Sequence, residues 1–132
     1  MYYQPIITHM NREHRDDTPA GRRARARKEN DDFRSSSVPL AIRLSKGELI
    51  FSGGIERLGY SCVVRAFEAV RAFRDFTPDL DTFREHDTGV LSVDGVPVLF
   101  MIEHVERQPF DPNAFDKDSF SPRLTILLAE EY

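Results

Sequence analysis

The dipeptide Asp94-Gly95 constrains the fold of this chain more than any other feature, because it stands between two apolar runs rich in β-branched residues. Aspartate and glycine both tolerate positive φ, which a two-residue type I′ turn requires at its two central positions. The sequence therefore predicts an antiparallel hairpin of residues 89–93 and 96–105. Such a turn places Val93 opposite Val96, so that the numbers of opposing residues add up to 189.

Hydrophobic spacing predicts the remaining elements. Alternation predicts a strand over residues 38–44 with a hairpin partner at 48–52, and a last strand at 123–129. Apolar residues three and four apart predict a main helix that Ser61 caps and that runs to about Asp75. The predicted fold class is α+β: one long helix packed on a mostly antiparallel sheet of four to five strands, with a short Arg-rich N-terminal helix.

The first quarter of the chain differs from the rest. Thr18 followed by Pro19 is typical of a helix start, with a hydroxyl cap and then proline at the first helical position. The helix that follows is rich in Arg and Ala and has one large apolar residue, Phe33, through which we expect it to dock. The predicted organisation is a flexible arm (1–17), an Arg-rich helix (18–36) and an α+β domain (37–132).

Charge follows the same division. Residues 1–36 hold eight basic and six acidic side chains, whereas residues 37–132 hold ten basic and sixteen acidic ones. The chain is thus predicted to be an acidic body with a basic arm, and its net charge is -4. The single cysteine, Cys62, excludes an internal disulfide and is expected in the core. No apolar run approaches the roughly 20 residues of a membrane span, and no signal layout opens the chain, so we expect a cytoplasmic protein.

A basic cluster on the N-terminal helix is the candidate for nucleic-acid contact. Its members are Arg22, Arg23, Arg25, Arg27 and Lys28. On one helix they would form a broad positive face able to contact phosphates. No aromatic residues interleave with the arginines, so a platform for base stacking is missing from this stretch. The alternative is a solvated helix whose charge is offset by the neighbouring acids.

The second candidate site lies at the open end of the hairpin. If the register continues past the strand, His86 faces Glu103, Glu85 faces His104, and Asp87 lies beside them. A histidine next to carboxylates can serve acid–base chemistry or bind a divalent metal. It can equally be a polar lock that fixes the loop onto the sheet, which is the interpretation we favour because no nucleophile or further ligand set is evident.

Several stretches of the chain carry a family resemblance. The clearest are NDDFR (30–34), FTPDLD (76–81), EHD followed by glycine (85–89) and LTILLAEEY (124–132). In these residues the chain resembles small bacterial proteins grouped as domain of unknown function family 3768. The resemblance implies no assigned activity. It implies an accessory protein encoded on plasmids, phages and other mobile elements. We expect no cofactor, with a divalent metal at the histidine–carboxylate cluster as the alternative.

Three functions follow from these observations. The first is a non-enzymatic interaction protein of a mobile element, one version of which inhibits a host defence complex; Phe110, Phe115 and Phe120 would anchor the partner protein unless they fold back over the sheet. The second is a metal-dependent or acid–base enzyme centred on the Glu85-His86-Asp87 and Glu103 cluster. The third is a nucleic-acid binder that uses the Arg-rich helix. An uncovered edge strand at 40–44 would also allow two copies to pair.

Overall fold

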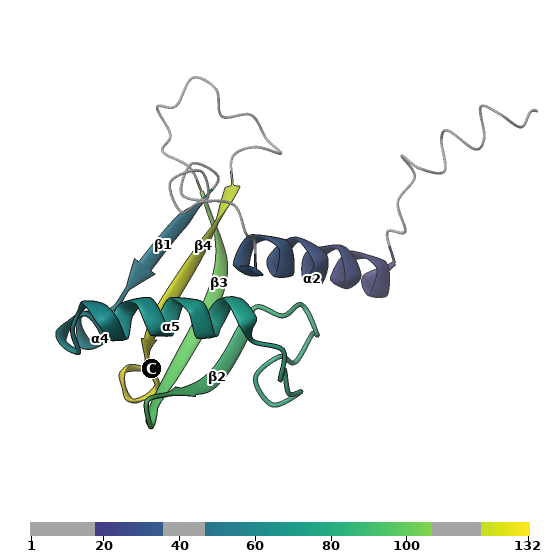
Figure 1. Cartoon of the computed structure of the whole chain (residues 1–132). Helices are drawn as coiled ribbons and strands as arrows, with labels where there is room; N and C mark the ends of the chain where they lie inside the picture. The colour runs from purple at the N-terminus through teal and green to yellow at the C-terminus, as the bar shows by residue number, and fades with distance from the viewer. Residues whose placement is uncertain (1–17, 36–46, 107–119) are drawn as a thin grey trace, which may run out of the picture.

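The computed structural model describes residues 18–35, 47–106 and 120–132 (Figure 1). The predicted arm at 1–17, the predicted strand at 38–44, and the loop with Phe110 and Phe115 lie outside the described residues. The described elements are α2 (Pro19–Ser35), β1 (Glu48–Phe51), α4 (Gly53–Arg57), α5 (Tyr60–Ala72), β2 (Thr88–Val93), β3 (Val96–Glu106), β4 (Phe120–Leu128) and the 3₁₀ turn η2 (Ala129–Glu131).

The four strands form one sheet in the order β1-β4-β3-β2. Strand β3 pairs antiparallel with β2 and with β4, whereas β1 runs parallel to β4. The fold is therefore α+β with a mostly antiparallel sheet, as the sequence predicts. The parallel position of β1 beside β4 was not predicted, because pairing between strands far apart in the chain leaves no local signal.

The central hairpin has the predicted turn and register. Asp94 and Gly95 have φ angles of 53° and 82°, as a type I′ turn requires. Paired residues run from Val93 opposite Val96 to Thr88 opposite Met101, so the predicted register is confirmed throughout β2. The Ile102 N–H donates to the Asp87 carbonyl at 2.8 Å, which extends the ladder one residue beyond the strand.

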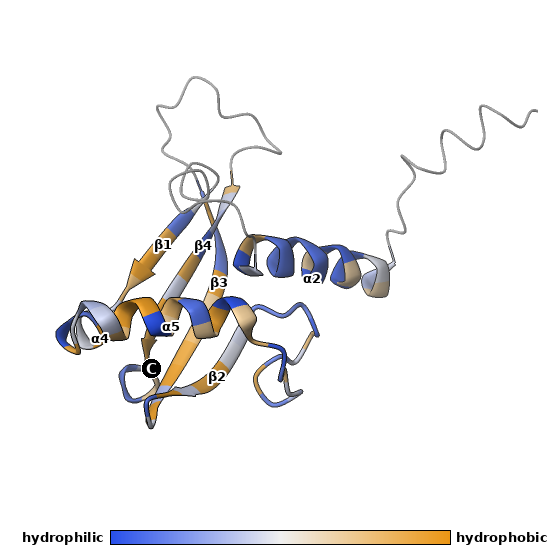
Figure 2. Ribbon diagram, in the orientation of Figure 1, coloured by the Kyte–Doolittle hydropathy of each residue, from blue (hydrophilic) through white to orange (hydrophobic). Residues whose placement is uncertain are grey.

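Helix α5 packs across the sheet and builds the core (Figure 1). Its buried residues are Cys62, Ala66 and Val70, and they lie in one cluster with Phe100 and Ile126 of the sheet. Cys62 is buried and free, as expected. Figure 2 shows the contrast with α2, whose surface is mostly hydrophilic while the strands and α5 carry the apolar residues.

The ends of the main helix differ from the prediction. Gly59, with φ of 99°, precedes the helix in place of a Ser61 cap, and the helix begins at Tyr60. The helix stops at Ala72 because Phe73 has an extended backbone, with ψ of 137°. This turn buries the Phe73 ring at 5.3 Å from that of Phe100, so core packing ends the helix before Asp75.

A short helix, α4, stands where the sequence predicted only the end of a strand. The Ser52 side chain accepts from the Ile55 N–H at 3.2 Å and so caps it. The Glu131 carboxylate, from the far end of the chain, accepts from the Gly54 N–H at 3.1 Å and from the Ser52 hydroxyl at 2.6 Å. A carboxylate is favourable at this helix end because the first N–H groups of a helix lack partners.

Removal of the Glu131 charge is expected to change the acid dependence of stability. The Ser52 hydrogen bond and then the Leu128 backbone N–H lower the pKa of Glu131 from its ordinary value of 4.5. A lowered pKa contributes stability that is fully present above 4.5 and is lost as the pH falls through the folded-state pKa. The free energies of unfolding of Glu131→Gln and the wild type, measured by urea titration, should therefore converge as the pH falls below 4.5. A difference that stayed constant across this range would contradict the prediction.

The prediction of one long helix beside a short Arg-rich helix differs from the structure, because the Arg-rich helix α2 has 17 residues and α5 has 13. The predicted cap is confirmed, since the Gly21 N–H donates to the Thr18 hydroxyl at 3.1 Å. Phe33 packs against the core, yet the buried residues of the helix are Gly21, Asn30 and Arg34. None of the helices in the described ranges has the length and apolarity needed to cross a membrane.

Candidate functional site

Helix α2 docks on the rest of the protein mainly through polar side chains. Arg27, Asn30, Asp31 and Arg34 recur at spacings of three and four, so they share one helix face. Each contacts the end of α5 or the loop between α5 and β2. Asn30 and Arg34 are 2% and 1% exposed. From apolar residues alone, Phe33 was the only docking residue predicted for this helix. The signal that was missed is the recurrence of polar residues at the same spacing of three and four.

Arg34 closes the end of helix α5. Its Nη1 donates to the carbonyls of Val70 at 2.8 Å and Phe73 at 2.9 Å, at the end of the helix where carbonyls run out of helical N–H partners. The Val70 carbonyl also accepts from the Phe73 N–H at 3.2 Å. Its Nη2 donates to Asp31 at 3.0 Å. Burial lowers the pKa of the Arg34 guanidinium, and the hydrogen bond and charge of Asp31 oppose this shift. The group also lies over the Phe76 ring, 5.2 Å from its centroid, in a cation–π contact.

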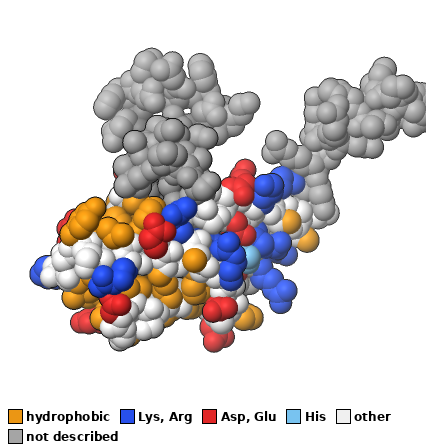
Figure 3. Space-filling view, in the orientation of Figure 1, with side chains coloured by type: hydrophobic (Ala, Val, Ile, Leu, Met, Phe, Trp, Pro, Cys, Tyr) orange, Lys and Arg blue, Asp and Glu red, His pale blue; other side chains and the backbone are white. Residues whose placement is uncertain are grey.

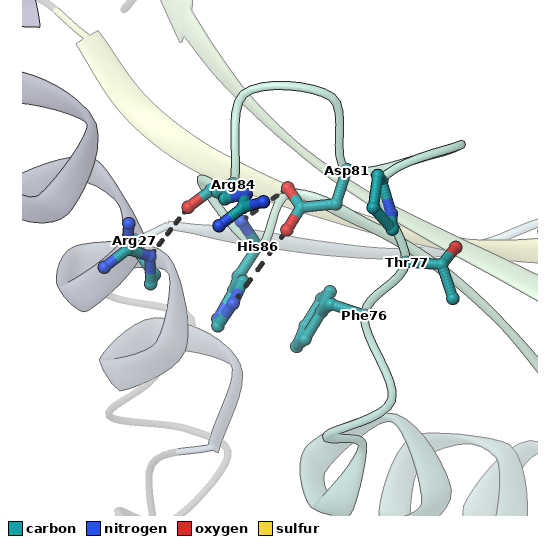
Figure 4. A pocket seen from close by; sticks show the side chains of 7 residues that line it. Arg27, Phe76, Thr77, Asp81, Arg84 and His86 are labelled. Carbon is teal, nitrogen blue, oxygen red and sulfur yellow. Dashed lines mark hydrogen bonds and ion pairs between the residues drawn. The ribbon is translucent and has the colours of Figure 1, made fainter. Parts of the chain in front are cut away.

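His86 lies between two carboxylates. Its Nδ1 is 2.9 Å from Asp31 Oδ1. On the other side of the ring, its Nε2 is 3.9 Å from Asp81 Oδ2, and Figure 4 shows the His86 and Asp81 side chains facing each other. The ring stacks on Phe76 with parallel planes and 3.9 Å between centroids. Asp81, which is 3% exposed, also accepts the His86 backbone N–H at 2.9 Å. The imidazole is thus hydrogen-bonded through Nδ1, has a second carboxylate near Nε2, and is covered on one ring face.

The partner predicted for His86 is wrong. The ladder ends at Asp87, and His86 and Arg84 have φ angles of 58° and 56°, which turn the loop away from the sheet and toward α2. In the described part of the chain Glu103 makes no contact with His86; it is exposed and stands opposite Arg123 of β4. The register was right, and the error lay in extending it through a residue with left-handed backbone.

The predicted Glu85–His104 pair is also replaced by contacts with α2. The Asn30 side-chain amide donates to the Glu85 carbonyl at 3.0 Å, and the Asn30 side-chain oxygen lies 3.3 Å from His104 Nε2. Asp87 remains at the end of the ladder, where burial and then the charge of Asp81 raise its pKa. No group of three or more His, Cys, Asp or Glu side chains within 18–35, 47–106 and 120–132 is arranged to hold a metal ion.

A hollow opens between α2 and the loop beside His86 (Figure 4). It has two adjoining parts, of about 460 and about 480 Å³, that share Arg27 and Arg84. The first part is further lined by Phe76, Thr77, Pro78, Asp81 and His86, and the second by Ala20, Arg23, Thr82 and Phe83. Figure 3 shows Lys and Arg side chains gathered around a histidine on this face. We call these two parts together the basic hollow.

Polar contacts with α2 and the buried Asp81 hold the loop that forms this hollow. Arg27 Nε donates to the Arg84 carbonyl at 2.7 Å, and the contacts of Glu85 and His86 described above complete the attachment. These contacts keep Arg84 and His86 in left-handed backbone, which costs non-glycine residues on the order of 1–3 kcal/mol each. Such strain persists where the surrounding structure over-determines a segment, and it is frequent at binding sites.

The basic cluster divides between the hollow and the outer surface of α2. Only Arg23 and Arg27 of the predicted set line the hollow; Lys28 pairs with Asp32 at 2.8 Å, and Arg22 and Arg25 are not among the lining residues. The guanidinium groups of Arg23 and Arg84 make no hydrogen bond or ion pair with any described residue. Two uncommitted cations therefore face one cavity. Phe120, the predicted partner anchor that can be placed, is exposed at the start of β4.

The fold and this site define a small α+β protein whose N-terminal helix is docked by polar contacts beside a basic hollow. The chain belongs to the family described as "Protein of unknown function (DUF3768)", which it matches over residues 51–131, more than half of its length. No curated protein and no solved structure matched the chain. The matched span contains Phe76, Asp81, His86 and Glu131, whereas α2 precedes it.

The motifs of the resemblance meet in space at this site. NDDFR contributes Asn30, Asp31 and Arg34, FTPDLD contributes Phe76 and Asp81, and the EHD stretch contributes Glu85 and His86. These side chains and backbone groups bond or stack with one another rather than pointing to solvent. The motifs thus encode a set of contacts that attaches α2 and shapes the loop.

Proposed function

We propose that this protein is a non-enzymatic interaction protein, and that the basic hollow receives an anionic part of its partner. The observation that carries the proposal is the pair of guanidinium groups, Arg23 and Arg84, that have no partner among the described residues and face one cavity. The chain as a whole has a net charge of -4, so the positive charge gathered at the hollow is opposite in sign to the charge of the whole chain. Such a patch favours and steers anionic ligands.

The contacts of His86 support a binding role over acid–base catalysis. A general acid or base needs a ring nitrogen within hydrogen-bond reach of the substrate. In His86, Nδ1 is bonded to Asp31 and Nε2 lies 3.9 Å from Asp81 Oδ2, so each ring nitrogen has a carboxylate of the protein beside it. The geometry therefore favours a polar lock that holds the loop, with α2 as the element to which the loop is fixed.

The narrower prediction comes from the family resemblance alone. It describes an accessory protein of a plasmid, phage or other mobile element that inhibits a host defence complex. A small protein that binds without catalysis would suit that role. The basic hollow would supply the binding surface that this role requires. We therefore keep the role as part of the proposal.

Retention on immobilised heparin, a sulfated polyanion, tests the proposal. We expect the double variant Arg23→Gln, Arg84→Gln to elute at clearly lower salt than the wild type, because both uncommitted cations of the hollow are removed. Arg27 is left in place because it also holds the loop. The measurement is the salt concentration at the elution peak.

A matched control separates the hollow from net charge. The double variant Arg57→Gln, Arg65→Gln removes the same charge from α4 and α5, outside the hollow. It should elute close to the wild type. Equal shifts for the two double variants would show that overall charge controls retention, and the proposal would then be abandoned.

A further inference from the structure

We infer that the anionic partner is a single-stranded nucleic acid, with Phe83 as the platform on which one base stacks. The inference rests on the proposed function and adds the chemical class of the partner. Phe83 is 64% exposed and lines the second part of the hollow together with Arg23, Arg27 and Arg84. An exposed aromatic ring thus stands among the cations that would contact phosphates.

The combination of an aromatic ring and cations is what single-strand recognition requires. Proteins of this kind hold the backbone in a positively charged groove and stack bases on aromatic side chains. The Arg-rich stretch has no aromatic residue among its arginines, so this stretch alone provides no stacking platform. The fold supplies one from a distant loop, because the Arg27 and Asn30 contacts fix that loop against α2.

Charge and size of the second part of the hollow support the same ligand. None of its lining residues is acidic, so no carboxylate opposes a phosphate there. Its volume of about 480 Å³ lies in the range of small-molecule sites, which suits one nucleotide unit. A base can reach Phe83 only when it is unstacked, so the proposal specifies a single strand rather than a duplex. An acidic peptide would use the arginines but would have no need of the exposed ring.

The test compares three probes by fluorescence anisotropy: a short oligothymidylate, an abasic strand of the same length, and a polyglutamate of the same charge. Phe83→Ala should weaken oligothymidylate binding by roughly tenfold or more and leave the abasic strand unaffected, because only stacking is lost. Arg84→Gln should weaken both strands. It should also reduce the slope of log K against log salt by about 0.7 for each phosphate contact removed.

Tyr60→Ala is the matched control, because Tyr60 is 84% exposed and does not line the hollow. It should bind oligothymidylate as the wild type does, and thermal melts should show Phe83→Ala folded. If Phe83→Ala binds oligothymidylate like the wild type while heparin retention still depends on Arg23 and Arg84, the nucleic-acid inference is wrong and the proposed function stands. Tighter binding of polyglutamate than of oligothymidylate would also overturn the inference, in favour of an acidic protein partner.

Discussion

Replacement of Arg34 by alanine is expected to lower the free energy of unfolding by about 1.5–3 kcal/mol, the range for hydrogen bonds made by a charged group. The guanidinium bonds the last carbonyls of α5 and Asp31 of its own helix, and it is almost wholly buried. Without it, the Val70 and Phe73 carbonyls each lose a charged donor and keep only the Phe73 N–H and Arg74 Nη1, respectively. Urea unfolding followed by circular dichroism gives the measurement.

Two controls define what the Arg34 result means. Arg34→Lys keeps the charge but cannot donate from one planar fork to several carbonyls, so it should remain substantially destabilised. Arg65→Ala removes an exposed arginine that pairs with Asp94, and surface pairs contribute only about 0–1 kcal/mol. If Arg34→Ala were no less stable than Arg65→Ala, polar docking of α2 would not be a main source of stability.

Replacement of Gly89 by alanine is expected to destabilise the protein by about 1–3 kcal/mol, the usual cost of overpacking a core. A Cβ at Gly89 would lie 2.5 Å from Cε2 of Phe100 and 2.7 Å from Cε2 of Phe73. Both rings belong to the core, so they cannot move without disturbing their other contacts. The free energy of unfolding, again from urea titration, is the quantity to compare.

Gly53→Ala is the matched control for this prediction. Its Cβ would come nearest to Nη1 of Arg57, at 3.2 Å, and that atom is the end of a flexible exposed side chain. Gly53 opens helix α4, where alanine is a better helix former than glycine. The variant should therefore be as stable as the wild type or slightly more stable. Equal losses from the two substitutions would argue against close packing of the rings at Gly89.

Local chemistry explains which parts of the fold could be predicted. The Asp94-Gly95 turn requires only the two residues that form it, and the hairpin register follows from its length. The cap at Thr18 and the apolar face of α5 are likewise properties of neighbouring residues. Helix α4 was missed because its N-terminus is stabilised partly by Glu131, at the other end of the chain.

The sequence directed attention to the loop that docks on α2, and not to the contacts of that loop. The stretch Glu85-His86-Asp87 was singled out as a candidate polar cluster. Its partners are Asn30 and Asp31, some fifty-five positions earlier, and hydrophobic spacing could not reveal them. Phe83 drew no attention in the sequence because its position beside the arginines exists only after the loop has docked.

The sequence by itself determined the hairpin, the α+β class and the family, because turn preferences, residue periodicity and motifs are all read over short distances along the chain. Only the tertiary structure decided that His86 pairs with Asp31, that Arg34 closes α5, and that a basic hollow carries an exposed aromatic ring. The physical reason is that polar contacts are short and directional. They form between whichever groups the packing of distant segments brings within about 3 Å.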